Sequence, residues 1–276
     1  MIALLRTEWV KAFRRTRSLV IVGLLVGLPL LIVWAINRRQ QRVNRGEGEG
    51  LFRLASQSGL LVPAAVLSVM SGFLLVVIAG SLAGDSVAGD ATTGNLRYLL
   101  MRPVARGRLL VAKAVVAGAL IWLSTILVAL AALLAGLFLF GAHPVTVPNL
   151  GAGLDVFTLS THSLVVRTLI GTAYVAFGYT ALLALGVFYS TLTDSAAGAI
   201  GATIGTYIVS EILDAITQLG TVRYAFPTHY LNAWEPMFRN NTYSQDMVAG
   251  LVVQVAYLVV FGTAAIVWFR RKDIRS

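Results

Sequence analysis

The sequence predicts an all-α integral membrane protein with six transmembrane helices. Hydrophobic residues make up 57% of the chain and charged residues only 12%, which is about half the charged fraction of a water-soluble domain. The mean hydropathy is +0.79. A chain with so little polar surface needs a lipid bilayer as its solvent, and six apolar runs are long enough to cross one, since a span takes about 20 residues.

We assign the whole chain, residues 1–276, to one transmembrane domain: an interfacial helix over 1–17, six spans within 18–269 and a tail over 270–276. The third apolar run exceeds what one span requires, so we expect it to tilt or to begin along the interface. The first run is too long for a signal-peptide core and has no small-x-small cleavage site, which predicts an uncleaved span. The six runs are Ser18–Ile36, Leu60–Leu82, Leu109–Phe140, Leu164–Tyr189, Ala196–Leu219 and Met247–Phe269.

An even number of spans puts both ends of the chain on one side of the membrane. That side carries fourteen of the 22 Lys and Arg residues: five before the first span, five after the second and four in the tail. The positive-inside rule therefore predicts cytoplasmic termini, although the arginines between Arg38 and Arg53 lie on the other side and count against it. Arginine outnumbers lysine nineteen to three, which we interpret as a GC-rich bacterial genome and hence a plasma or inner membrane location.

Composition also excludes several kinds of chemistry. The chain has no cysteine, so it forms no disulfide, thiolate metal site or cysteine nucleophile. The net charge of +10 comes from basic residues that flank the apolar runs, which indicates anchoring to anionic lipid rather than nucleic-acid binding. No metal-ligand spacing links the three histidines, His143, His162 and His229, so we expect no metal site.

Residues 1–15 have the pattern of an amphipathic helix. Ile2, Leu5, Trp9 and Phe13 fall on one stripe, while the basic residues face elsewhere. Such a helix lies on the cytoplasmic leaflet, and the sequence leaves open whether it also contacts a cytoplasmic partner.

The loop after the second span contains a short amphipathic helix by its pattern. Leu96, Leu99 and Leu100 share one face, Pro103 ends the helix, and a basic turn leads to the third span. Physical chemistry alone allows two interpretations. The loop is either a connection that arginines hold at the lipid headgroups, or a segment that binds a partner and transmits its force to the spans.

This loop resembles the signature of ABC-2 type permeases, in which an acidic residue, a Gly-Thr-Leu-Arg run, Leu-Leu, Pro-Val and Ser-Arg lead to a lysine. Asn95 replaces the usual Thr, Ala105 the usual Ser, and an Asp the commoner Glu. The stretch from Glu8 to Arg15 is also similar to that family's lead-in to its first span. The matching residues are Asp90, Gly94, Leu96, Arg97, Leu99, Leu100, Pro103, Val104, Arg106 and Lys113.

The resemblance implies the permease subunit of an ATP-driven exporter, which dimerises with a second copy or a similar permease and binds a separate ABC ATPase. Relatives carry lipids, glycans, peptides or small molecules. The chain has no phosphate-binding Gly-x-x-x-x-Gly-Lys motif, so we expect it to be no enzyme and to bind no cofactor, with ATP and Mg held by the partner. The implied coupling helix and its flanks comprise Asp90, Gly94, Leu96, Arg97, Leu99, Leu100, Arg102, Pro103 and Arg106.

Small residues mark two further spans. Gly23 and Gly27 in the first span, and Gly201 and Gly205 in the fifth, form G-x-x-x-G patterns that allow close helix approach. This packing could lie within one subunit. In the resembled family, spans one and five line the dimer interface and the substrate path, which favours a role between subunits.

Glu211 and Asp214 share a face late in the fifth span. Ionisable groups in a span usually face protein or a water-filled cavity, so the pair either lines the outer part of the translocation path, relays protons, or is a structural pair near Arg223. The aromatic stretch from Gly220 to Asp246 is too broken for a span, and we expect short interfacial or re-entrant helices there.

Two other functions remain as alternatives: an ion-coupled carrier that uses Glu211 and Asp214, and an intramembrane enzyme. No catalytic motif appears in any span. We see neither the broken mid-membrane helices nor the inverted repeat that ion-coupled carriers more often show.

Overall fold

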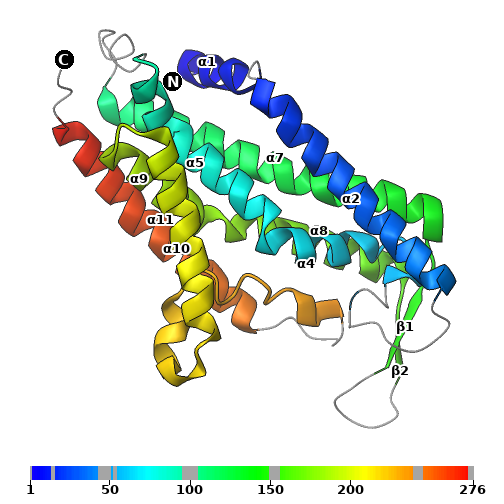
Figure 1. Cartoon of the computed structure of the whole chain (residues 1–276). Coiled ribbons are helices and arrows are strands. Elements are labelled where there is room, and N and C mark those ends of the chain that lie inside the picture. The colour runs from blue at the N-terminus through cyan, green and yellow to red at the C-terminus, as the bar shows by residue number, and fades with distance from the viewer. Residues whose placement is uncertain are drawn as a thin grey trace.

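The computed structural model describes residues 2–13, 16–42, 51, 55–94, 105–148, 156–238 and 245–272. Within these ranges, six helical segments are long and apolar enough to cross a membrane, which confirms the predicted all-α membrane fold. The spans run side by side in an elongated bundle with both ends of the chain at one end of it (Figure 1). We call this the termini end, and the other the opposite end.

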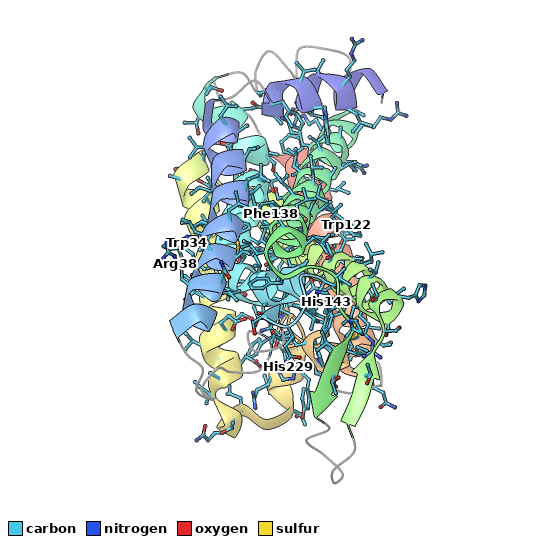
Figure 2. All side chains as sticks on the ribbon, turned by 90° about the vertical axis from the view of Figure 1, so that its right-hand side faces the viewer. Trp34, Arg38, Trp122, Phe138, His143 and His229 are labelled. Carbon is cyan, nitrogen blue, oxygen red and sulfur yellow. The ribbon has the colours of Figure 1, made fainter. Side chains whose placement is uncertain are left out.

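The chain begins with two helices of different orientation. Helix α1 (Ile2–Phe13) lies across the termini end, and α2 (Thr16–Arg42) is the first span and runs along the bundle (Figure 2). Trp9 and Phe13 pack together on α1, with ring centroids 5.4 Å apart, and both remain partly exposed. The predicted N-terminal helix is therefore present as a separate element.

The second and fourth spans are each interrupted. The sequence analysis, in contrast, found no broken helices. The second consists of α4 (Val62–Gly72) and α5 (Leu74–Thr92), which meet at Phe73. The fourth consists of α8 (Thr161–Gly178) and α9 (Thr180–Leu192), which meet at Tyr179. Both interruptions directly follow a glycine, the weakest helix former after proline. The second span also ends at Thr92 rather than Leu82.

Hydrogen bonds satisfy backbone groups at both interruptions, as an apolar surrounding requires. The buried Tyr179 hydroxyl donates to the Ser71 carbonyl at 2.7 Å, which links one interruption to the other. On the sixth span, α11 (Gln245–Arg271), the buried Gln254 accepts from the Ala181 amide and donates to the Pro227 carbonyl, each at 2.8 Å. These bonds hold the interruptions in one geometry.

The third and fifth spans are the continuous helices α7 (Arg106–Phe140) and α10 (Ala196–Ala215). Helices α5 and α10 approach so closely that a methyl group on Gly84 would lie 2.8 Å from the Ile200 Cα. A larger residue at Gly84 would therefore force the two backbones apart.

The opposite end carries the short elements. Strands β1 (Val145–Pro148) and β2 (Val156–Leu159) form an antiparallel hairpin, which the sequence patterns did not predict. The 3-10 helices η1 (Thr217–Ala225) and η2 (Glu235–Phe238) occupy the aromatic stretch where short helices were expected. Trp234 and Phe238 are fully buried there, so this segment packs into the bundle. Its placement relative to a membrane stays a prediction.

Candidate functional site: an ion cluster at the termini end

Two charged residues from the sequence signature meet at the termini end. Asp90 lies in the last turn of α5 and Lys113 in the second turn of α7, and each side chain is only 2% exposed. The Lys113 ammonium donates a hydrogen bond to Asp90 Oδ2. This pair therefore joins the two helices that flank residues 95–104.

Helix α1 contributes two further charges to the same place. The Lys113 ammonium donates to both carboxylate oxygens of Glu8, each at 3.0 Å, and the Lys11 ammonium donates to Asp90 Oδ1. Glu8 and Lys11 share a face of α1 because they are three residues apart. We name Glu8, Lys11, Asp90 and Lys113 the ion cluster.

The ion cluster holds two acids and two bases, so its formal charges balance. A buried charge is tolerated only when it is paired and hydrogen-bonded, and removing one partner leaves the other uncompensated. Lys11 is the most exposed member, with 34% of its side chain accessible. The cluster thus fixes the position of α1 against α5 and α7 through paired charges, two of which are almost fully buried.

Gly94 and Arg106 shape the two edges of the coupling segment. Gly94 has φ +70°, a left-handed conformation that favours glycine, and its amide donates to the Ala91 carbonyl at 3.0 Å, so α5 ends in a tight turn. The Arg106 guanidinium donates to the Lys272 carbonyl at 2.8 Å, which joins the start of α7 to the end of α11.

The end of α9 and the turn that follows it complete the contacts of α5. The Ser190 hydroxyl accepts from the Val87 and Ala88 amides at 2.9 and 2.8 Å. The Thr92 hydroxyl donates to the Asp194 carbonyl at 2.9 Å, and the Asp194 carboxylate forms a 2.7 Å ion pair with Lys272. The end of α5 is thus bonded to α1, α7 and the end of α9, and Asp194 connects it in turn to the C-terminal Lys272.

The structure describes only part of the predicted coupling segment. Gly94 and Arg106 lie at its edges, whereas Asp90, which the sequence analysis placed in the loop after the second span, lies within α5. Their part in coupling stays a prediction. Sequence reasoning did not assign Glu8, Lys11 or Ser190 to the site. Glu8 could have been singled out from the sequence, because it is the only acidic residue among the first 17. Six predicted coupling residues lie outside the described residues, and their role stays a prediction: Leu96, Arg97, Leu99, Leu100, Arg102 and Pro103.

The acids late in the fifth span have separate partners. Asp214 forms an ion pair with Arg223 at 3.5 Å and a hydrogen bond with His229, so the partner that the sequence suggested is present. Glu211 hydrogen-bonds the Tyr207 hydroxyl. These contacts suit the structural interpretation of Asp214, while a place in the translocation path stays a prediction.

The glycine pairs of spans one and five face open space within the single chain. Among the described residues, no atom beyond the glycine's own stretch of helix lies within 4 Å of a Cβ built at any of the four residues Gly23, Gly27, Gly201 and Gly205. Among the residues that the structure describes, no group of three or more potential metal ligands occurs. His143 and His229 lie in separate parts of the opposite end (Figure 2).

The described residues thus form a six-span membrane bundle in which charged contacts join α1, α5 and α7 at the termini end. Residues 2–274 match the family described as ABC-2 family transporter protein, and the chain belongs to that family. A search of curated proteins found no match. The chain is therefore a membrane subunit of an ABC transporter, of a kind that is not itself catalytic and that works with an ABC ATPase subunit.

Proposed function

We propose that this chain is the permease half of an ATP-driven exporter in a bacterial cell membrane. Two permease copies, identical or similar, form the pathway for a lipid, peptide, glycan or small molecule. The termini end faces the cytoplasm, where residues 94–108 bind the ATPase. ATP and Mg belong to the ATPase, and its closure moves the spans.

The ion cluster is the observation that carries this proposal. Asp90 and Lys113 connect the two flanks of the coupling segment to each other and to α1. Movement of residues 94–108 would therefore displace α5, α7 and α1 together, because separating any of them breaks a buried ion pair. A rigid connection of this kind would allow movement of the coupling segment to transmit force to the spans.

An ion-coupled carrier is less well supported. Interrupted spans are common in such carriers, and the interruptions at Phe73 and Tyr179 fit that description. However, the Tyr179 hydroxyl bonds the Ser71 carbonyl beside the first interruption, and Gln254 bonds the Ala181 amide beside the second, so these two backbone groups already have partners. Membership of the ABC-2 family favours ATP as the energy source.

The test is a comparison of two variants in the coupling segment. Leu96, Leu99 and Leu100 would fill an apolar groove on the ATPase, with Arg97 and Arg102 at its rim. A buried anchor contributes on the order of 2 kcal/mol to an interface and a rim charge far less. Leu99→Asp should therefore abolish co-purification of the ATPase and its stimulated ATP hydrolysis, whereas Arg102→Ala should weaken both only modestly. Full binding and full stimulation with Leu99→Asp would show that the loop is only a lipid-anchored connection.

A further inference from the structure

Two neighbouring pockets lie between α1, α2, α5 and α7 near the termini end, and they differ in polarity. The polar one is lined by the ion cluster together with Asp85 and Ser86, and its empty space of about 450 Å³ includes the open space at its mouth. The apolar one is lined by side chains such as Leu25 and Leu127, and its empty space of about 550 Å³ likewise includes open space outside it. Ala12, Leu82 and Leu120 line both pockets, and we call the two the polar and the apolar part of one groove.

The polar part contains groups of both signs and one unsatisfied hydroxyl. Three carboxylates, from Glu8, Asp85 and Asp90, line it alongside the ammonium groups of Lys11 and Lys113. The Ser86 Oγ atom is shielded from solvent and has no hydrogen-bond partner among the described residues. A shielded hydroxyl is costly without a partner, so the Ser86 hydroxyl would gain a hydrogen bond by turning toward a polar ligand held in the polar part.

The apolar part opens sideways toward the surface of the bundle. Val22 on α2 and Leu123 on α7 line it, and their side chains are 43% and 42% exposed. Both residues belong to spans, so this surface lies against the hydrocarbon region in a membrane. A chain of methylene groups can therefore enter the groove from the bilayer while the headgroup of the same molecule reaches the ion cluster.

We propose that this groove is a binding site for a phospholipid with a primary-amine headgroup, of the phosphatidylethanolamine type. The headgroup ammonium binds among the carboxylates and donates to the Ser86 hydroxyl. The phosphate pairs with the partly exposed Lys11 at the rim, and one acyl chain lies between α2 and α7. Phosphatidylcholine lacks an N–H donor, and phosphatidylglycerol lacks the cation.

The experiment measures lipid retention by native mass spectrometry on the full-length chain in detergent, without the ATPase. Its outcome is therefore independent of the proposed coupling function. The protein is exposed to an equimolar mixture of phosphatidylethanolamine, phosphatidylcholine and phosphatidylglycerol with identical acyl chains. We expect a several-fold preference for the ethanolamine lipid. Equal retention of all three lipids, or preference for either competitor, would overturn the proposal.

Two substitutions on α7 test the location of the site. Leu123→Trp should fill the apolar part and remove the preference, because Leu123 lines the groove. Leu130→Trp is the matched control, since Leu130 has similar exposure on the same helix and does not line the groove. Equal preference in both variants would place the lipid elsewhere and overturn the site.

Ser86→Ala provides a second test that does not depend on filling the groove. The substitution adds no bulk and removes only the hydroxyl that would accept from the lipid ammonium. The ethanolamine lipid should lose its advantage over the choline lipid, while total lipid retention stays unchanged. An undiminished advantage in Ser86→Ala would contradict the proposed headgroup position.

Discussion

Lys113 is the member of the ion cluster that contacts both acids, and its surroundings leave it little access to water. Glu8 reaches it from α1 and Asp90 from α5, so one ammonium group serves three elements. A lysine that is buried in this way does not help to keep the protein soluble. What Lys113 contributes to the stability of the fold depends on the presence of both Glu8 and Asp90, so we expect substitutions in this cluster to be destabilising.

Replacing Lys113 with methionine keeps most of the length of the side chain and removes the charge. Asp90 and Glu8 then lose a partner in a buried place, and breaking such a pair costs on the order of 3 to 5 kcal/mol. We expect Lys113→Met to lower the unfolding temperature clearly in a thermal-shift assay in detergent.

Lys272→Met is the control for this substitution. Lys272 pairs with Asp194, whose side chain is 73% exposed, and a surface ion pair contributes about 1 kcal/mol or less. An equal loss of stability in Lys113→Met and Lys272→Met would mean that the ion cluster contributes no more than a surface pair.

Gln254 is a second residue whose contribution to stability comes from the backbone groups to which it hydrogen-bonds. Gln254→Leu preserves approximate volume but leaves the Ala181 amide and the Pro227 carbonyl without their partner, at about 1–3 kcal/mol for each buried group. We expect reduced thermal stability and faster amide exchange around Tyr179. Gln218→Leu, at an exposed position of η1, should change neither measurement, and identical behaviour of the two variants would contradict the capping role.

At the scale of elements, the apolar runs predicted all six spans because length and hydropathy determine which segments enter a bilayer. The interruptions were not predictable in this way, since they depend on partners distant in the sequence. Gly72 and Gly178 were weak local signals, but the bonds from Tyr179 and Gln254 exist only in the folded bundle.

The same distinction applies to the ion cluster. The motif identified Asp90 and Lys113, whose helices are adjacent in the chain. It did not identify Glu8, because 105 residues separate Glu8 from Lys113 and no local pattern connects them. The β1–β2 hairpin was missed because its strands have only four residues each and lie in a region assigned to a loop.

The glycines of α10 offer a test of dimer formation at the level of one helix. Replacing Gly201 and Gly205 with leucine should weaken the dimer, because bulky side chains keep helices apart. The single chain should tolerate the change, since nothing lies within 4 Å of either position. The mass in detergent and the thermal stability are the two measurements.

Gly84→Leu provides the contrast, because Gly84 packs against Ile200 within the chain. This variant should unfold at a lower temperature. An unchanged mass of the Gly201→Leu/Gly205→Leu variant would count against a dimer through α10.

At the scale of the whole molecule, α1 and the last turns of α11 lie at the same end of the bundle (Figure 1). The ion cluster lies at this end too, because it includes two residues of α1. The distribution of basic residues predicts that this end is cytoplasmic. Reporter fusions at Asn44 and Ser276 should therefore give opposite results, with Ser276 in the cytoplasm and Asn44 outside. A cytoplasmic signal from Asn44 would reverse the proposed orientation.

The placement of the ion cluster also determines an order of events during biosynthesis. Helix α1 leaves the ribosome before the spans, yet Asp90 and Lys113 follow 79 and 105 residues after their partners Lys11 and Glu8. Until the second span is inserted, α1 lacks Asp90, and until the third span follows it also lacks Lys113, so its basic residues hold it on anionic lipid in the meantime. Docking of α1 is consequently a late step, and a docked α1 indicates that the first three spans have reached their positions in the membrane.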